Sequence, residues 1–136
     1  MTSGGCCCGA IRYEADGPRS HETSCHCSTC RRTSGAPFVA WVTFPSAGVR
    51  VTRGDPVAFR SSPNAVRSFC GRCGTQLFFR QDALPDQTDV TIASLDDPEA
   101  IPPRDHTFVR SRLSWVRLAD GLPEHSGTRP EPPLRP

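Results

Sequence analysis

The sequence has no long uninterrupted run of apolar residues and no lysine among its 136 residues. Without about 20 consecutive apolar residues it offers no membrane-spanning helix, and its first residues, MTSGGCCCG, lack the basic and apolar regions of a signal peptide. These absences predict a cytoplasmic protein with no membrane partner. The formal net charge of only +2 argues against a protein that coats nucleic acid, so we expect no nucleic-acid partner either.

Large apolar residues are also scarce, whereas proline and glycine are plentiful. Hydrophobic residues make up 36% of the chain, beside 14 prolines and 11 glycines, which predicts many short elements joined by tight turns and little helix. One turn of helix is expected at 28–34, and residues 113–118 are ambiguous between strand and loop. Short apolar, β-branched or aromatic stretches predict a mostly β fold with strands at 10–14, 39–44, 49–52, 57–60, 66–69, 76–79, 89–93 and 106–109.

The length is that of one ordinary domain, and we see no internal repeat and no second domain. From Gly121 onward the sequence GLPEHSGTRPEPPLRP is rich in proline and nearly devoid of large apolar residues. Such a segment is expected to wrap the surface or to form a mobile tail. We therefore predict a zinc-binding domain at 1–123 and a proline-rich C-terminal tail at 124–136.

The eight cysteines carry most of the functional information. A disulfide framework, a metal site and a run of small buried side chains would each use cysteine. In a reducing cytoplasm, metal ligation or catalysis is the more expected use. The cysteines form three groups: Cys6, Cys7 and Cys8; Cys25, Cys27 and Cys30; and Cys70 and Cys73.

The last group lies in the motif CGRCG, which has the form of a zinc knuckle whose glycines let both thiolates face one ion. A tetrahedral structural zinc needs two more thiolates, and Cys6 and Cys8 would share one face of an extended strand. A structural zinc is therefore predicted at Cys6, Cys8, Cys70 and Cys73. The alternative is that CCC is buried filler beside a redox C-x-x-C motif, but such a motif belongs in a βαβ unit that this chain lacks.

The middle group, in the motif CHCSTC, provides three thiolates within six residues and no obvious fourth. Three protein ligands and one open position are typical of a catalytic zinc, whereas a structural zinc is closed. A zinc held by three thiolates should activate water weakly and suit capture of a soft thiolate. Cys25, Cys27 and Cys30 are therefore predicted to be the ligands of a catalytic zinc.

Four residues beside these ligands have less certain roles. Cys7 should point away from its neighbours, as a small core or partly buried thiol. His26 is a tempting fourth ligand, but on an extended stretch its side chain would point away from the sulfurs. Arg31 and Arg32 would either offset the negative charge of the cluster or bind a substrate carboxylate, or they would simply point to solvent.

Together these residues resemble the glutathione-dependent formaldehyde-activating enzyme family, whose domain is shared with centromere protein V. The resemblance runs from about Gly5 to Pro123. It implies a β-tent fold of short antiparallel strands around two zinc sites, a structural one and a catalytic one, in agreement with the two cysteine sets above. It is carried by GGCCCGAIRYE, CHCSTCRRTSGAPFVAWVTF, SSPNAVRSFCGRCGTQLFF, TIASLDDP and SWVRLADGLP.

The resemblance also implies carbon–sulfur lyase chemistry, namely the reversible condensation of formaldehyde with glutathione to S-hydroxymethylglutathione. The expected function is thus a zinc-dependent lyase that acts on a thiol adduct, with two Zn²⁺ per chain and a small-molecule thiol such as glutathione as its partner. The alternative is a non-enzymatic zinc module that binds a macromolecule. That alternative predicts a basic or disordered extension, and the chain offers only a short tail of mixed charge. No particular oligomeric state is indicated.

Overall fold

The structure of the protein is a computed structural model that describes residues 1–130. The end of the expected tail, 131–136, lies outside the described residues. The helix α1 is Ser28–Ser34, and four short 3-10 helices are η1 Ser46–Gly48, η2 Ile92–Ser94, η3 Pro98–Ala100 and η4 Val109–Ser111. The strands are β1 Thr2–Gly5, β2 Arg12–Ala15, β3 Ser20–Cys25, β4 Val39–Pro45, β5 Val49–Arg53, β6 Val57–Ser62, β7 Ala65–Phe69, β8 Gln76–Gln81, β9 Gln87–Thr91 and β10 Asp105–Thr107.

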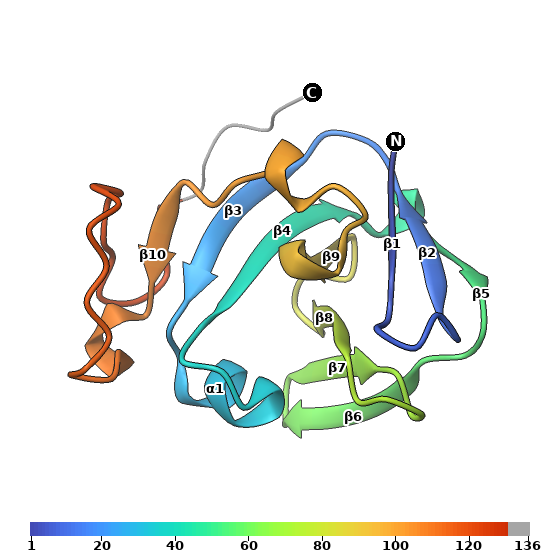
Figure 1. The fold of residues 1–136 in the computed structure, drawn as a ribbon, viewed down its shortest axis with the longest axis horizontal. Coiled ribbons are helices and arrows are strands. Elements are labelled where there is room, and N and C mark those ends of the chain that lie inside the picture. Colours follow the sequence, from blue (N-terminus) through green and yellow to red (C-terminus); the bar gives the residue numbers. More distant parts are fainter. Residues whose placement is uncertain (131–136) are drawn as a thin grey trace.

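The strands form two sheets, which confirms the expected mostly β fold. A small sheet has the order β1-β2-β5, and a larger, curved sheet has the order β10-β3-β4-β9-β8-β7-β6. Figure 1 shows the small sheet on one side of the molecule and β10 at the opposite end of the large sheet. The neighbouring strands pair antiparallel except that β10 runs parallel to β3, so the large sheet is mixed.

Two strands were not predicted from the sequence, and 113–118 forms no strand. In β1, Gly4 pairs with Tyr13, and a Cβ at Gly4 would lie 2.4 Å from the Tyr13 hydroxyl. Glycine is therefore required by the close approach, although it lowers the strand propensity. In β3 the residues are mostly polar but buried, and the Thr23 hydroxyl donates to that of Thr107 on β10 at 3.1 Å. Tertiary contacts thus override weak local propensity.

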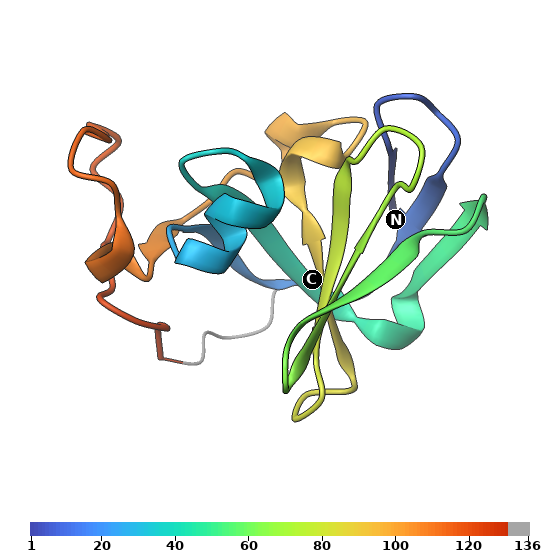
Figure 2. The ribbon, with the colours of Figure 1, turned by 90° about the horizontal axis from the view of Figure 1, so that it is seen from below.

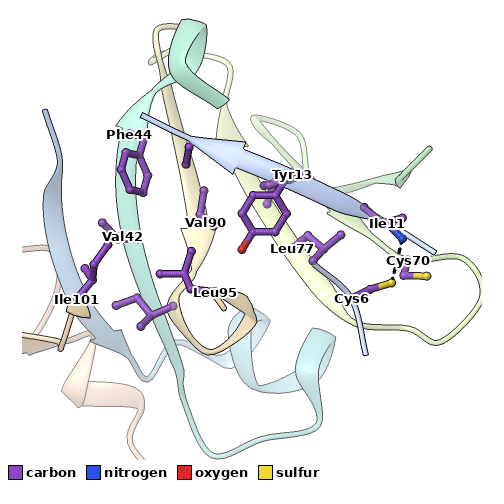
Figure 3. Close-up of a cluster of buried hydrophobic side chains, with 13 residues drawn as sticks. Cys6, Ile11, Tyr13, Val42, Phe44, Cys70, Leu77, Val90, Leu95 and Ile101 are labelled. Atoms are coloured by element: carbon purple, nitrogen blue, oxygen red, sulfur yellow. Dashed lines mark hydrogen bonds between the residues drawn. The ribbon is translucent and has the colours of Figure 1, made fainter. Parts of the chain in front are cut away.

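One face of the large sheet packs against the small sheet to form the main core. Val42, Val90 and Phe78 lie directly opposite one another on β4, β9 and β8, so their side chains share this face. They meet Tyr13 of β2 and Ile11, which directly precedes β2, and the Tyr13 ring stands edge-on to that of Phe78, with centroids 5.0 Å apart. Figure 3 shows this cluster, with the sulfurs of two cysteines at one end of it. Packing in this core therefore holds the two sheets together and positions the two buried cysteines of a thiol cluster.

The next row of residues points to the other face. Thr43, Asp89, Phe79 and Arg67 lie directly opposite one another on β4, β9, β8 and β7. Successive residues of a strand alternate between faces, so this row is turned away from the core. Phe79, Asp89 and Arg67 line a cavity on that side. The large sheet therefore separates a hydrophobic core from a polar and aromatic pocket.

The described part of the expected tail runs along β10. The His106 N–H donates to the carbonyl of Pro123 and the His125 N–H donates to the carbonyl of His106, both at 2.8 Å. An Arg129 guanidinium nitrogen donates to a carboxylate oxygen of Asp105 at 2.6 Å. Figure 2 shows this segment at the end of the molecule farthest from the small sheet. Over residues 1–130, no helix is both long and apolar enough to cross a bilayer.

Candidate metal centres and their pocket

The first thiol cluster joins the N-terminal segment to the loop between β7 and β8. One ligand atom from each of Cys6, Cys8, Cys70 and Cys73 lies within 4.8 Å of the others. The Sγ atoms of Cys6 and Cys8 are 3.6 Å apart, and those of Cys8 and Cys70 are 3.8 Å apart. Four sulfurs so arranged could hold one metal ion, and thiolate is a ligand preferred by zinc.

Two tight turns bring these sulfurs together. The Gly9 N–H donates to the carbonyl of Cys6 at 3.0 Å, and the Gly74 N–H donates to that of Cys70 at 2.8 Å. Both glycines have left-handed backbones, with φ of 73° and 79°. The expectation that Cys6 and Cys8 lie on an extended strand is therefore wrong: residues 6–9 form a turn, and the sulfurs converge because the chain curls.

Hydrogen bonds to two of the sulfurs favour thiolates at Cys6 and Cys73, whereas the pKa of Cys8 is raised to about 11. The Ile11 N–H donates to Sγ of Cys6 at 3.2 Å. The hydroxyl of Thr75 lies 3.2 Å from Sγ of Cys73, and this contact is the main reason why the pKa of Cys73 falls to about 5. Cys7 is exposed, which corrects the prediction of a core or partly buried thiol. Its N–H donates to Thr75 at 3.1 Å, so its backbone supports the turn while its thiol faces solvent.

The second cluster lies where β3 passes into α1. Cys25 ends β3, Cys27 is the N-cap of α1, and Cys30 lies in the first turn of the helix. Their three sulfurs lie within 4.8 Å of one another. The Cys30 N–H donates to Sγ of Cys27 at 3.3 Å, so the cysteine acts as the helix cap. The predicted helix thus has the bounds expected from the sequence, and the helix and its N-cap residue together supply two of the three sulfurs.

The ionisation of these three thiols suits a cation. Hydrogen bonding with Cys25 and Cys30 lowers the pKa of Cys27, whereas hydrogen bonding with Cys27 and Cys30 raises the pKa of Cys25 far above its usual value. Without a cation, one thiolate is stabilised at the expense of its neighbours. A divalent ion would allow all three to ionise, so the donor set fits a thiolate-bound zinc.

The histidine and the two arginines that adjoin these cysteines in the sequence lie outside the thiol cluster. His26 is fully buried, and its Nε2 lies 2.9 Å from Nδ1 of His106, whose Nε2 is 2.7 Å from Asp120. His26 is therefore outside the thiol cluster, as predicted, and burial lowers its pKa. Arg31 is half-buried and Arg32 is exposed, and neither lines the cavity.

The second cluster opens into a cavity of about 550 Å³ on the outer face of the large sheet. Cys25, Cys27 and Cys30 all line it, beside the aromatic side chains of Trp41 and Phe79. Trp41 is buried, and the centre of its ring lies 6.1 Å from that of the Phe79 ring. Trp115, by contrast, is 68% exposed and takes no part in the core or the pocket. A cavity of this size suits a small organic ligand.

Arg67 is a buried cation of the pocket that no sequence motif indicated. It is 4% exposed, and both of its terminal nitrogens lie 3.6 Å from Sγ of Cys30. Its guanidinium stacks 4.7 Å from the centre of the Phe79 ring. In the sequence Arg67 is one of 16 arginines, 37 residues from Cys30, and only the pairing of β7 with β8 brings it to the pocket.

Asp89 is a second residue of the pocket that no sequence motif indicated. One of its oxygens accepts a hydrogen bond from the Thr43 hydroxyl at 2.5 Å. Burial raises the pKa of Asp89 to about 6, although the Thr43 hydrogen bond and the charge of Arg67 act in the opposite direction. A carboxyl with such a pKa changes its protonation state near neutral pH. Its strand was predicted, but nothing in the alternating sequence of β9 distinguishes this aspartate from a solvent-facing one.

Comparisons with known proteins agree with this architecture. The glutathione-dependent formaldehyde-activating enzyme family matches residues 1–111. An uncharacterized lyase of Schizosaccharomyces pombe is 37% identical over 78 residues, which are 56% of this chain and 55% of that protein, so the match spans about half of the relative's length. A crystal structure of a Rhodobacter sphaeroides protein shares the fold, with a TM-score of 0.57 and 24% identity over 90% of this chain and 98% of the other. On the extent of the family match, this chain belongs to the glutathione-dependent formaldehyde-activating enzyme family.

Proposed function

We propose that the protein is a zinc-dependent carbon–sulfur lyase that acts on adducts of formaldehyde with low-molecular-weight thiols, with S-hydroxymethylglutathione as its substrate. One observation carries this proposal: the three thiols of Cys25, Cys27 and Cys30 open into a ligand-sized cavity in a chain of this family. The matching relative is named a lyase, which is consistent with the reaction class.

The two thiol clusters have different proposed roles. Cys6, Cys8, Cys70 and Cys73 would hold a structural zinc, because four sulfurs from two distant segments close the coordination sphere. Cys25, Cys27 and Cys30 would hold the catalytic zinc, because three sulfurs leave one position open toward the cavity. When bound there, that zinc would hold the substrate sulfur as a thiolate and make it available for C–S bond formation or cleavage.

The side chains of the pocket would bind and orient the reactants. Arg67 places two donors on Sγ of Cys30 and so offsets the negative charge of the thiol cluster. Trp41 and Phe79 provide apolar walls that exclude water from the reacting groups. Holding the thiol and formaldehyde in one cavity converts a bimolecular reaction into an effectively unimolecular one.

The proposal is tested by following formaldehyde with a panel of thiols: glutathione, cysteine, cysteinylglycine and 2-mercaptoethanol. We expect protein loaded with zinc to exchange formaldehyde with glutathione well above the spontaneous rate, and faster than with 2-mercaptoethanol, because only a larger thiol fills the cavity. The Cys27→Ser variant should lose this acceleration. A protein with two bound zinc ions that accelerates none of these reactions would contradict the proposal and favour a non-enzymatic zinc module.

A further inference from the structure

Asp89 is positioned on the pocket face of the large sheet by the register of four strands. It lies directly opposite Thr43 on β4 and Phe79 on β8, and Phe79 in turn lies opposite Arg67 on β7. These residues are in the interior of the sheet, where strand pairing limits their movement. Asp89 therefore stands at a fixed place in the wall of the cavity that the second thiol cluster also lines.

The two oxygens of Asp89 have different environments. Oδ1 accepts the hydrogen bond from Thr43, whereas Oδ2 has no hydrogen-bond partner among residues 1–130. The side chain is half-buried, and Oδ2 is not one of the fully enclosed polar atoms that lack a partner. One oxygen is thus held by the protein, and the other is available to a molecule in the cavity.

The charged and titratable groups that line the cavity with Asp89 come from several elements of the fold. His21 belongs to β3 and Arg67 to β7, Arg129 comes from the tail, and the three thiols come from the segment around α1. Arg129 is paired with Asp105, and Arg67 is directed to Cys30. Within the described cavity lining, Asp89 is the one carboxyl.

We propose that Asp89 is a catalytic residue that transfers the hydroxyl proton of the thiol adduct. This role rests on the proposed function. In the lyase direction, the Asp89 carboxylate removes the proton of the S–CH₂–OH group. The O–H electron pair becomes the second C–O bond of formaldehyde, the C–S bond breaks with its electrons on sulfur, and the proton passes from Asp89 to the departing thiolate. In condensation the same steps run in reverse, and no oxidant or reductant is required.

The electrostatics agree with this role. Burial raises the pKa of Asp89 to about 6, so the carboxylate predominates at neutral pH but remains basic enough to accept a proton. Because the lyase direction begins with the carboxylate, its kcat should rise as the pH rises through about 6. The hydrogen bond from Thr43 lowers the pKa of Asp89, so removing this bond should shift the rise in kcat to higher pH.

The test compares Asp89→Asn with Asp86→Asn, a matched change at an exposed aspartate in the β8–β9 turn. Breakdown of S-hydroxymethylglutathione is followed by exchange NMR across pH 5–8, on proteins with equal zinc content and equal melting temperature. We expect Asp89→Asn to lower kcat at least ~100-fold and to abolish the rise near pH 6. Asp86→Asn should match the wild type, and Thr43→Val should move the rise upward. If Asp89→Asn keeps kcat within about threefold and retains the rise, the role of Asp89 is overturned while the lyase function stands.

A second measurement does not depend on catalysis. The Asp89 carboxyl is observed by ¹³C NMR, with its signal assigned by its loss in Asp89→Asn. We expect saturation with S-(2-hydroxyethyl)glutathione, a stable homologue of the substrate, to shift this signal and its titration midpoint. If the zinc-loaded wild type is inactive, the proposed function fails. The NMR measurement then tests Asp89 on its own. A shift of its carboxyl signal supports contact with the hydroxyl group of the ligand, and the absence of a shift overturns the proposed role.

Discussion

Replacing Cys70 with serine is expected to leave the protein unfolded or insoluble. Cys70 is 1% exposed and belongs both to the main core and to the four-thiol cluster. Apparent binding free energies of structural zinc are about 10–16 kcal/mol, whereas a whole domain is stable by only about 5–15 kcal/mol. Losing one of four ligands should therefore remove most of the net stability, which thermal melting and soluble yield would report.

Three further variants separate metal loss from damage to the core. Cys73 is exposed, so Cys73→Ser leaves the core intact but should also destabilise the protein strongly. Cys7→Ser changes an exposed thiol outside the cluster and should melt like the wild type. Cys27→Ser should remain folded. A Cys70→Ser or Cys73→Ser variant that melts normally and retains all its metal would show that this cluster is not a structural zinc site.

The second large effect is expected from mild chelation. A chelator should first remove roughly one of two zinc equivalents, from Cys25, Cys27 and Cys30, and abolish lyase activity while circular dichroism stays unchanged. These three ligands come from one short segment and would leave one coordination position open to the cavity, whereas the other four join two distant segments and would close the coordination sphere of their ion. Added glutathione should occupy the open position and slow the loss.

The Cys27→Ser variant is the control for this experiment. It should contain about one zinc and release little of it under the same conditions, because only the closed four-ligand site remains. Release is followed by a chromogenic chelator, with circular dichroism recorded in parallel. Loss of both ions together with the fold, or activity that survives removal of the labile ion, would contradict the assignment of the catalytic zinc.

Much of the fold could be predicted because the buried strands carry regular patterns. In WVTF of β4, Val42 and Phe44 enter the core while Trp41 and Thr43 point to the opposite face of the sheet, and this alternation is typical of a strand. β1 and β3 escaped prediction because their stability comes from tertiary contacts. Gly4 of β1 fits against Tyr13, and β3 is held by contacts such as the hydrogen bond from the Thr23 hydroxyl to that of Thr107 on β10.

The site could be predicted only in part. The seven cysteines of the two clusters could be identified because metal ligands occur at short, characteristic spacings in the sequence. In the structure the sulfurs within each set lie close to one another. Arg67 and Asp89 have no such signal. Each lies on a separate strand, and they come to line one cavity with the thiols only through the order β9-β8-β7 and the register of its pairs. Long-range strand pairing is the information that local patterns lack.

The central claim is that lyase activity depends on a zinc ion at Cys25, Cys27 and Cys30. Its most direct test is to return zinc stepwise to fully demetallated protein and to measure circular dichroism and glutathione–formaldehyde exchange at each step. We predict that the first equivalent restores the fold without activity, and that activity then rises linearly through the second equivalent and levels off. Full activity after the first equivalent, or activity that does not depend on zinc, would contradict the account.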